Sequence, residues 1–208
     1  MSTSTTVRVW LARHGETEAN RGGLYCGHSE TKLTVRGEAQ AAALGRRLAA
    51  VKVTGVATSD LGRAVATAGI ALAGKGLAPY VDPDLRELHY GQWEMKKDAE
   101  IRRDDPAQHK LMRDEDPAWQ PPGGEDLGQV RTRMADAFRR LVSRTPSGDV
   151  LVVSHGTALS CLFAELLGMP TDHALRMAPA NCGLSRLDVA GGRVYLALFN
   201  DVSHLDGI

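Results

Sequence analysis

Residues 7–20 read VRVWLARHGETEAN, an apolar run that ends abruptly in an arginine, a histidine and a glycine. The run from Val7 to Ala12 is rich in β-branched and apolar residues and predicts a buried strand. A strand that ended for structural reasons alone would need only a turn former, and Arg13 and His14 are poor turn formers. The stretch therefore predicts a strand whose tip presents side chains chosen for their chemistry.

Strand and helix patterns alternate along the rest of the chain. Two helices are predicted after the N-caps Thr34 and Ser59 or Asp60. A third helix is predicted to open at Asp126, and a fourth to stop at Gly168 and Pro170. Further strands are predicted over 53–58, 150–153, 184–189 and 194–199. The last two strands flank Gly191-Gly192 and predict a β-hairpin. This alternation predicts an α/β fold, a three-layer α/β/α sandwich with a mostly parallel central sheet and one antiparallel edge.

The length of 208 residues suits one α/β domain spanning 1–208, with room for an inserted cap. Residues 92–125 are rich in charge and interrupted by prolines. We therefore expect this stretch to be a partly helical cap insertion that lies outside the sheet. Trp93 and Trp119 lie within it, and packing in a core is the better-supported use for both.

Composition excludes several classes of function. The 25 basic and 25 acidic residues cancel, so no global field favours nucleic acid or an anionic membrane, and no apolar run reaches the length of a membrane span. Three cysteines without metal-ligand spacing, and an N-terminus unlike a signal peptide, favour a reduced cytoplasmic protein without a bound metal. We expect a small-molecule partner, no nucleic acid and no membrane, and leave a homodimer open.

Polar and charged side chains follow the predicted strands, and in open parallel sheets ligands bind at the carboxyl ends of strands. Those ends deliver Arg13, His14, Arg63 and His155. Guanidinium groups bind phosphate oxygens bidentately, and neutral imidazole is a nucleophile near pH 7. Two arginines and two histidines on one edge therefore predict an anion site that contains a nucleophile.

Each of these residues also has a structural interpretation. A single histidine after a strand is more often a satisfied structural residue than a catalyst, and Arg63 alone would be read as a solvated helix residue. Their joint position at three predicted strand ends favours the site. The histidines that lack such a context are expected to be surface residues: His28, His109 and His173.

A series of segments extends this pattern along nearly the whole chain. In order they are LARHGETEAN, YCGHSETKLTVRGEAQA, TSDLGRAVATA, LRELHYGQWE, PPGGEDLGQV and VVSHGTALS. Together they resemble the histidine phosphatase superfamily, the phosphoglycerate-mutase-like proteins. A lone Arg-His-Gly tripeptide would say little, whereas this many segments in the family's order make chance agreement improbable.

The resemblance implies a role for each residue at the strand ends. His14 is implied as the nucleophile that attacks phosphorus and becomes a phosphohistidine. Arg13, Arg63 and His155 are implied to surround the equatorial phosphoryl oxygens, where charge must be held through the transition state. Arginine and imidazolium then supply the positive charge, so no metal and no cofactor is expected.

A proton donor is also required, because an alkoxide is a poor leaving group. The resemblance places Glu87, in LRELHYGQWE, at the position of the family's acid. The structural alternative is a surface pair of Glu87 with Arg86. Asp82 and Asp84 are rival acids of lower rank, because both flank Pro83 in what reads as a turn.

Further positions match phosphate-binding positions of the family: Asn20 through its amide, Gly27 through a backbone N–H, and Thr157 through a backbone N–H at a helix start. The chain departs from the family's usual residues at Cys26, Met95 and Ser160. These positions are expected near the pocket mouth or the start of the cap, so the resemblance does not identify the substrate.

The sequence therefore predicts a metal-independent phosphomonoesterase of class EC 3.1.3, a histidine acid phosphatase-type enzyme that acts on a small phosphorylated metabolite. Within the family the stretch 87–94 looks most like small-molecule phosphatases such as α-ribazole phosphatase and glucosyl-3-phosphoglycerate phosphatase. The alternatives are a cofactor-dependent phosphoglycerate-type mutase and a non-catalytic phospho-ligand binding protein. Phosphatase is favoured over mutase because the chain ends soon after its last strand, and water access decides the outcome.

Overall fold

A computed structural model describes residues 6–208, so the first five residues of the expected 1–208 domain lie outside the described part. A six-stranded sheet forms the centre of this part, with the strand order β3-β2-β4-β1-β5-β6. The strands are β1 (Val7–Arg13), β2 (Val53–Thr58), β3 (Tyr80–Val81), β4 (Gly148–Ser154), β5 (Leu184–Ala190) and β6 (Arg193–Asp201). The two-residue strand β3 was not predicted, because two residues are too few to show the alternation of apolar and polar side chains that identifies a strand.

Strand β1 lies inside the sheet and pairs with β4 in parallel and with β5 in antiparallel orientation. The parallel pairs β2–β4 and β2–β3 extend the sheet on one side. On the other side β5 and β6 form the predicted hairpin, whose Gly191 and Gly192 have positive φ angles of 55° and 75°. The predicted α/β fold with a mostly parallel sheet and an antiparallel edge is confirmed.

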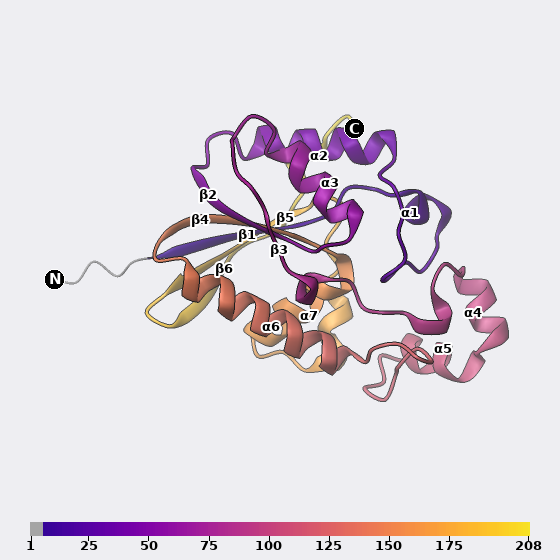
Figure 1. The fold of residues 1–208 in the computed structure, drawn as a ribbon. Coiled ribbons are helices and arrows are strands. Elements are labelled where there is room, and N and C mark those ends of the chain that lie inside the picture. The colour runs from indigo at the N-terminus through magenta and orange to yellow at the C-terminus, as the bar shows by residue number, and fades with distance from the viewer. Residues whose placement is uncertain (1–5) are drawn as a thin grey trace.

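Helices cover both faces of the sheet (Figure 1). The helices are α1 (Glu18–Gly22), α2 (Val35–Arg47), α3 (Gly62–Ala71), α4 (Asp98–Asp104), α5 (Pro106–Arg113), α6 (Leu127–Arg144) and α7 (Gly156–Leu166). Short 3-10 turns lie at Pro83–Leu85, Gly91–Trp93, Thr171–Arg176 and Ser203–Leu205. One apolar cluster joins the sheet to α2 and α3, and a second joins it to α6 and α7.

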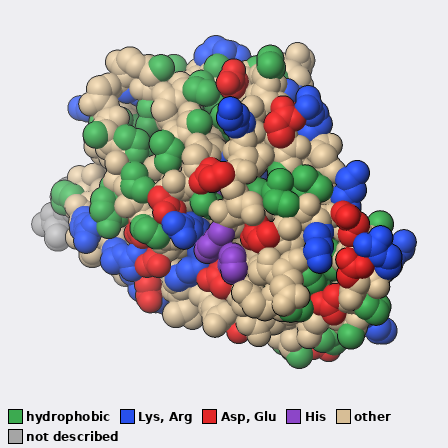
Figure 2. All heavy atoms as spheres, turned by 45° about the vertical axis from the view of Figure 1, so that its right-hand side comes forward, with side chains coloured by type: hydrophobic (Ala, Val, Ile, Leu, Met, Phe, Trp, Pro, Cys, Tyr) green, Lys and Arg blue, Asp and Glu red, His purple; other side chains and the backbone are tan. Residues whose placement is uncertain are grey.

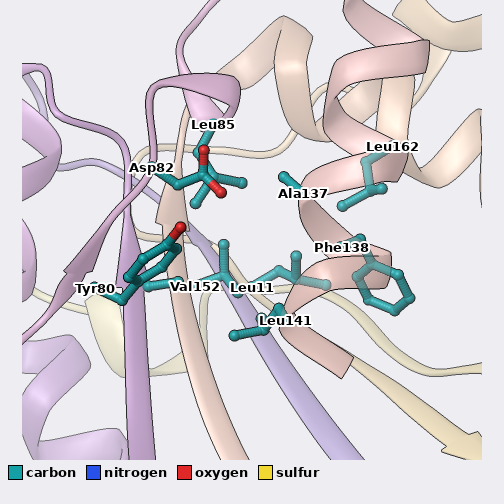
Figure 3. A pocket seen from close by; sticks show the side chains of 10 residues that line it. Leu11, Tyr80, Asp82, Leu85, Ala137, Phe138, Leu141, Val152 and Leu162 are labelled. Atoms are coloured by element: carbon teal, nitrogen blue, oxygen red, sulfur yellow. The ribbon is translucent and has the colours of Figure 1, made fainter. Parts of the chain in front are cut away.

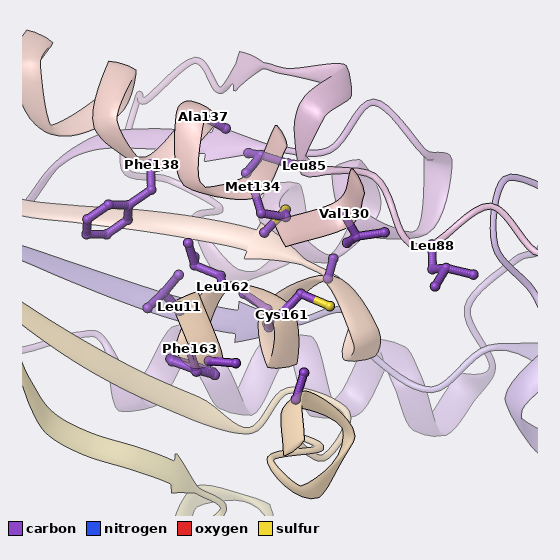
Figure 4. Close-up of a cluster of buried hydrophobic side chains, with 14 of the residues drawn as sticks. Leu11, Leu85, Leu88, Val130, Met134, Ala137, Phe138, Cys161, Leu162 and Phe163 are labelled. Carbon is purple, nitrogen blue, oxygen red and sulfur yellow. The ribbon is translucent and has the colours of Figure 1, made fainter. Parts of the chain in front are cut away.

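The alternation of side chains along β1 supplies both clusters. Trp10 and Ala12 belong to the cluster under α2 and α3, whereas Leu11 belongs to the cluster under α6 and α7. Figure 4 shows Leu11 opposite Leu162 and Phe163 of α7, with Met134 and Phe138 of α6 above them. Burial on both faces explains why the first strand reads as a nearly continuous apolar run.

The predicted cap is confirmed at Thr34, and Asp126, which was predicted to open a helix, is the N-cap of α6. Both side chains accept hydrogen bonds from backbone N–H groups of the first turn. The cap expected for α3 at Ser59 or Asp60 is wrong, because the helix begins at Gly62 with Leu61 in the cap position. The Ser59 hydroxyl accepts from Leu61 N instead, and the Asp60 carboxylate pairs with Arg86 at 2.7 Å. Asp60 therefore serves a tertiary contact and not the helix.

Residues 92–125 contain α4 and α5 and contribute no strand to the sheet (Figure 1), whereas their role as a cap insertion stays a prediction. Trp93 and Trp119 are buried with ring centroids 6.1 Å apart, which confirms their use in packing. His109 is also buried, with Nε2 2.9 Å from Oδ1 of Asp98, so its prediction as a surface residue is wrong. Within residues 6–208, no helix combines the length and the apolar character that crossing a membrane requires.

Candidate active site

The tips of β1 and β4 bring the two predicted histidines together. Because these strands are parallel neighbours in register, Arg13 lies opposite Ser154, and the next residues along are His14 and His155. The two imidazole rings lie edge to face with centroids 5.1 Å apart, and both side chains are buried. A pair that is 141 positions apart in the sequence thus forms one site at the carboxyl edge of the sheet.

His14 is held as a neutral imidazole with a defined tautomer. Its Nδ1 donates a hydrogen bond of 2.7 Å to the carbonyl of Gly15. Burial lowers the pKa of His14 well below its ordinary value of 6.5, and the charges of Arg13 and Arg63 lower it further. The lone pair therefore lies on Nε2, which makes no hydrogen bond to a residue between 6 and 208. This is the state that a nucleophilic histidine requires.

His155 and Arg13 present buried donors that lack partners. Nδ1 of His155 accepts a bond of 3.2 Å from Nε of Arg63, so the proton of the neutral ring lies on Nε2. Burial lowers the pKa of His155 well below 6.5, and Arg63 and His14 lower it further. Nε2 of His155 and Nε of Arg13 are both buried without a partner in the described part of the chain. Such orphaned donors are costly and mark a place where an anion fits.

Arg63 lies in the site, but its guanidinium is used differently from the sequence-based expectation. Besides His155, its terminal nitrogens donate to the carbonyls of Gly27 at 2.6 Å and Ser29 at 3.0 Å. Longer contacts reach Sγ of Cys26 at 3.8 Å and its carbonyl at 3.4 Å. Arg63 thus fixes the 26–29 loop and the tautomer of His155 while adding a buried positive charge.

Glu87 lies at the N-terminus of α7, on the same side as the histidines. Its carboxylate is buried and accepts hydrogen bonds from the backbone N–H groups of Leu88 at 2.8 Å, Thr157 at 3.1 Å and Ala158 at 2.9 Å. The surface pair with Arg86 does not form, because Arg86 pairs with Asp60. Both oxygens of Glu87 are therefore fixed in place near Arg13. Burial lowers the pKa of Arg13, and the charge of Glu87 acts in the opposite direction.

The rival acids lie elsewhere. Asp82 and Asp84 both accept from Arg140 of α6, at 2.9 Å and 2.6 Å. Figure 3 shows Asp82 at the border of a small apolar cavity between the sheet and α6, lined by Leu11, Phe138 and Leu162. This cavity has room for about 10 Å³, no more than one water molecule, so it is a packing defect and not a ligand site.

Three weaker expectations concerned direct phosphate contacts. Asn20 lies in the pocket wall, where Oδ1 accepts from Thr17 N and from Nδ2 of Asn181. The backbone N–H groups of Gly27 and Thr157 do not face an anion in the structure: they donate to the carboxylates of Glu94 and Glu87. The glycine at position 27 is nonetheless required, because a Cβ there would collide with the carbonyl of Leu88 and the carboxylate of Glu94.

A pocket of about 490 Å³ opens at this edge of the sheet, next to the buried His14, Arg63 and His155, which are not part of its lining. Its lining includes Arg13, Asn20, Glu87 and Thr157 from the predicted set, together with aromatic and aliphatic side chains. Cys26 and Ser160 also line it, as expected for positions near the mouth. Figure 2 shows one face of the molecule with basic and acidic side chains interspersed, in keeping with the balanced charge of the chain.

The sequence did not reveal several residues that hold the site together. Arg133 of α6 donates to the carbonyls of Asp84, Arg86 and Glu87. It thereby fixes the backbone of residues 84–87, which carries the predicted acid Glu87. Glu94 accepts four backbone N–H bonds, from Gly27, His28, Ser29 and Tyr90. Asn181 donates to the carbonyl of His14. Of these three residues, Glu94 lies in the segment LRELHYGQWE that carries the family resemblance, whereas no local sequence pattern marks Arg133 or Asn181.

His28 differs from its prediction as a surface residue. It is only partly exposed, its ring lies 4.7 Å from that of His89, and its Nε2 donates to the carbonyl of Glu87. Burial lowers the pKa of His28, and His89 lowers it further. His28 therefore braces the backbone of the predicted acid from the outside. Among residues 6–208, no three His, Cys, Asp or Glu side chains are grouped so as to hold a metal ion.

Comparison with known proteins adds an independent finding. The family model described as "Histidine phosphatase superfamily (branch 1)" matches residues 9–202. A "Probable phosphoglycerate mutase GpmB" from Cronobacter sakazakii is 36% identical over 206 residues, covering 96% of this chain and 95% of that protein. A putative alpha-ribazole-5'-P phosphatase from Escherichia coli superposes with a TM-score of 0.87 at 33% identity, covering 94% of this chain and 96% of that one. A mycobacterial glucosyl-3-phosphoglycerate phosphatase superposes with a TM-score of 0.85 at 30% identity, covering 94% and 99%.

Proposed function

The chain belongs to the histidine phosphatase superfamily, and from this premise we propose that it is a phosphomonoesterase of class EC 3.1.3 that hydrolyses a small phosphorylated metabolite without a metal. One observation carries the proposal. A buried neutral His14 presents Nε2 beside two buried donors, Nε of Arg13 and Nε2 of His155, that have no partner in the described chain. A nucleophile next to buried donors that can bind phosphoryl oxygens is what transfer of a phosphoryl group requires.

In the first step Nε2 of His14 attacks phosphorus in line with the leaving oxygen. The P–N bond forms as the P–O bond breaks, and Glu87 delivers a proton to the departing alkoxide. Arg13 and His155 donate to the non-bridging oxygens. Arg63 supports them with its charge, and a phosphoryl oxygen can take over its two long contacts to Cys26.

In the second step the phosphohistidine is hydrolysed. Glu87, now a carboxylate, takes a proton from a water molecule that attacks phosphorus as the P–N bond breaks. Inorganic phosphate leaves and Glu87 is again protonated. The same donors hold the charge in both steps, because the phosphoryl oxygens occupy the same positions.

A mutase is the second candidate, since the curated relative carries that name. The two functions share the first step and differ in the acceptor of the phosphoryl group: water for a phosphatase, a second hydroxyl of a phosphoglycerate for a mutase. Only the acceptor can distinguish them. A non-catalytic phosphate binder would retain the donors but would not need the neutral nucleophile at His14.

Turnover in ¹⁸O-labelled water tests the proposal. A phosphatase releases inorganic phosphate that carries one ¹⁸O atom per turnover, at a rate that EDTA does not change. Interconversion of 2- and 3-phosphoglycerate faster than phosphate release would establish a mutase instead. Loss of activity in EDTA, restored by magnesium or zinc, would contradict the metal-free mechanism, and no turnover of any ester would favour a binding protein.

The cellular setting is part of the proposal. We place the protein in the cytoplasm with a diffusible phosphoester as its partner, since the three cysteines are all free thiols and charges of both signs mix on the surface. Fractionation of cells that produce the protein, followed by immunodetection, tests this location. Recovery in the membrane fraction would contradict it.

A further inference from the structure

We infer that the site selects phosphomonoesters whose leaving group is uncharged and largely apolar, and discriminates against leaving groups that carry a carboxylate or a second phosphate. The inference rests on the proposed phosphatase function and names the substrate class of the same pocket. It follows from which charges line the pocket, which cations nearby are already paired, and which surfaces remain for the leaving group.

The first observation is the shortage of positive charge. Among the described residues that line the pocket of about 490 Å³, Arg13 supplies the positive charge and Glu87 the carboxyl group. Arg13 is used by the phosphoryl group in the proposed reaction, and Glu87 must lie next to the leaving oxygen. A second anionic group on the leaving alcohol would therefore find no second cation on the lining, and it would lie near a carboxylate once Glu87 has given up its proton, an arrangement that is unfavourable in a partly desolvated site.

The second observation concerns cations that lie near lining residues in the sequence or in space. Lys97, whose backbone bridges to that of Leu24, and Arg113, whose charge acts on Tyr25, are exposed and are not part of the lining. Three arginines are held in ion pairs. Arg21 pairs with Glu18, Arg176 with Glu115 at 2.6 Å, and Arg133 with Glu125 at 2.8 Å. Each of these arginines would have to give up an existing ion pair to reach a substrate. None of the three lines the pocket.

The third observation is the apolar and aromatic part of the pocket lining. Leu24, Tyr25, Tyr90, Leu175 and Ala178 contribute to the lining. The two tyrosine rings lie edge to face with centroids 5.2 Å apart. The Tyr25 hydroxyl lies 3.3 Å from a carboxylate oxygen of Asp98, and the Tyr90 hydroxyl 3.2 Å from that of Thr157. Ring surface is thus what remains for a ligand, and it favours a flat or aliphatic group.

This pocket contrasts with what a phosphoglycerate would need. A phosphoglycerate carries a carboxylate next to its phosphate, and a buried carboxylate needs a cation or several donors to replace its hydration. Beyond Arg13, the side chains of the lining offer neutral polar groups that already have partners. Nδ2 of Asn181 donates to Oδ1 of Asn20, the Ser160 hydroxyl donates to the carbonyl of Met177, and the Thr157 hydroxyl bonds to that of Tyr90. The lining therefore suits a neutral alcohol better than a hydroxy acid.

Three matched esters test the inference: benzyl phosphate, 4-carbamoylbenzyl phosphate and 4-carboxybenzyl phosphate. Their leaving alcohols have similar shape and basicity, so the comparison isolates the added charge. We expect kcat/KM for the two neutral esters to agree within a few-fold and kcat/KM for the carboxylate to be lower by at least about tenfold. Equal or faster turnover of the carboxylated ester would overturn the inference.

A pair of variants tests the cause. Leu24→Arg places a cation in the pocket wall, whereas Leu24→Met is a neutral control of similar length. The arginine variant is expected to raise kcat/KM for the carboxylated ester relative to benzyl phosphate by about tenfold, and the methionine variant to leave the ratio unchanged. An unchanged ratio in Leu24→Arg, with benzyl phosphate still cleaved, would show that charge in the pocket does not set the preference.

Binding separates this inference from the proposed function. Benzylphosphonate and 4-carboxybenzylphosphonate cannot be hydrolysed at the P–C bond, so calorimetry measures their Kd whether or not the protein is an enzyme. Tighter binding of the neutral phosphonate by at least about tenfold supports the preference even if no ester is cleaved, in which case only the proposed hydrolysis fails. Equal binding, or tighter binding of the carboxylated phosphonate, overturns the preference even if hydrolysis is observed.

Discussion

Nε of Arg63 donates a hydrogen bond of 3.2 Å to Nδ1 of His155, and this single contact decides which ring nitrogen of His155 carries the proton. The proton lies on Nε2, a buried donor with no partner among the described residues. Arg63 was expected to bind phosphate directly. In the structure its Nε orients His155, whose Nε2–H is the donor proposed to contact phosphate. His155 is a neutral donor and not the expected imidazolium, so the positive charge of the site comes from Arg13 and from Arg63, which lies behind His155.

The first prediction concerns the two tautomers. Long-range ¹H–¹⁵N spectra of the free protein at pH 6 are expected to show both rings neutral, with the proton on Nδ1 in His14 and on Nε2 in His155. The reason is that burial lowers both pKa values well below 6.5, and that Gly15 and Arg63 each engage one nitrogen. In urea the same two signals should titrate near 6.5. Protonation of either ring at pH 6 in the folded protein would contradict the assignment.

The second prediction identifies the nucleophile. Rapid quenching during turnover should trap acid-labile phosphate on the protein, and peptide mapping should locate it on His14, whose Nε2 is free to attack. His14→Ala should abolish both the label and turnover. The His173→Ala variant is a matched control outside the site and should keep both. Label retained in His14→Ala, or located on a serine, would show that another residue attacks phosphorus.

The third prediction concerns the orphaned donor of Arg13. Arg13→Lys keeps the charge but removes the Nε–H, so it should lower kcat/KM by about 100- to 1000-fold, as loss of one preorganised donor to a developing anion does. Arg193→Lys, on the exposed edge strand, is the control and should leave kcat/KM unchanged. Full activity of Arg13→Lys would mean that charge alone matters and that the geometry of the guanidinium does not.

The fourth prediction separates the proton donor from the phosphate binders. Glu87→Gln should lower kcat/KM for an alkyl phosphate by about 100-fold or more and for p-nitrophenyl phosphate far less, because nitrophenolate leaves without a proton. Arg13→Ala should damage both substrates alike, since both present the same phosphoryl group. If Glu87→Gln affects both esters equally, the acid must be sought elsewhere, although Arg140 already engages Asp82 and Asp84.

The fifth prediction concerns stability and Glu94, which accepts four backbone N–H bonds from the 27–29 loop and Tyr90. Burial acts to raise the pKa of Glu94, but these hydrogen bonds outweigh it and lower the pKa below the ordinary 4.5. A lowered folded-state pKa means that the stabilisation is fully present above 4.5 and is lost as the pH falls through the folded value. Glu94→Gln turns an NH₂ group toward these donors.

Urea unfolding at pH 7 measures the effect of this change. Glu94→Gln should lower the free energy of unfolding by about 2–4 kcal/mol, whereas Glu38→Gln, an exposed control on α2, should change it by less than about 0.5 kcal/mol. At pH 3 the difference between Glu94→Gln and the wild type should shrink. A difference that does not depend on pH would show that packing, and not the carboxylate charge, holds the loop.

Much of the site was predictable from the sequence for local reasons. The apolar run before Arg13 and the buried run before Ser154 each specify a strand, and parallel strands expose their carboxyl ends on one edge. That placed His14, Arg13 and His155 together without knowledge of their contacts. The same logic located Glu87 only with the help of the resemblance, because no periodic pattern marks the loop that carries it.

The sequence by itself therefore determined the layers of the fold, the strand tips and the residue types that meet there, since hydrophobic period and helix caps are properties of neighbouring residues. Tertiary structure alone decided the hydrogen-bond partners: Arg63 on His155, Glu94 on the 27–29 loop, and Glu87 on the N–H groups expected for phosphate. The physical reason is that each buried donor or acceptor takes whichever partner packing brings within about 3 Å, and that partner lies far away in the chain.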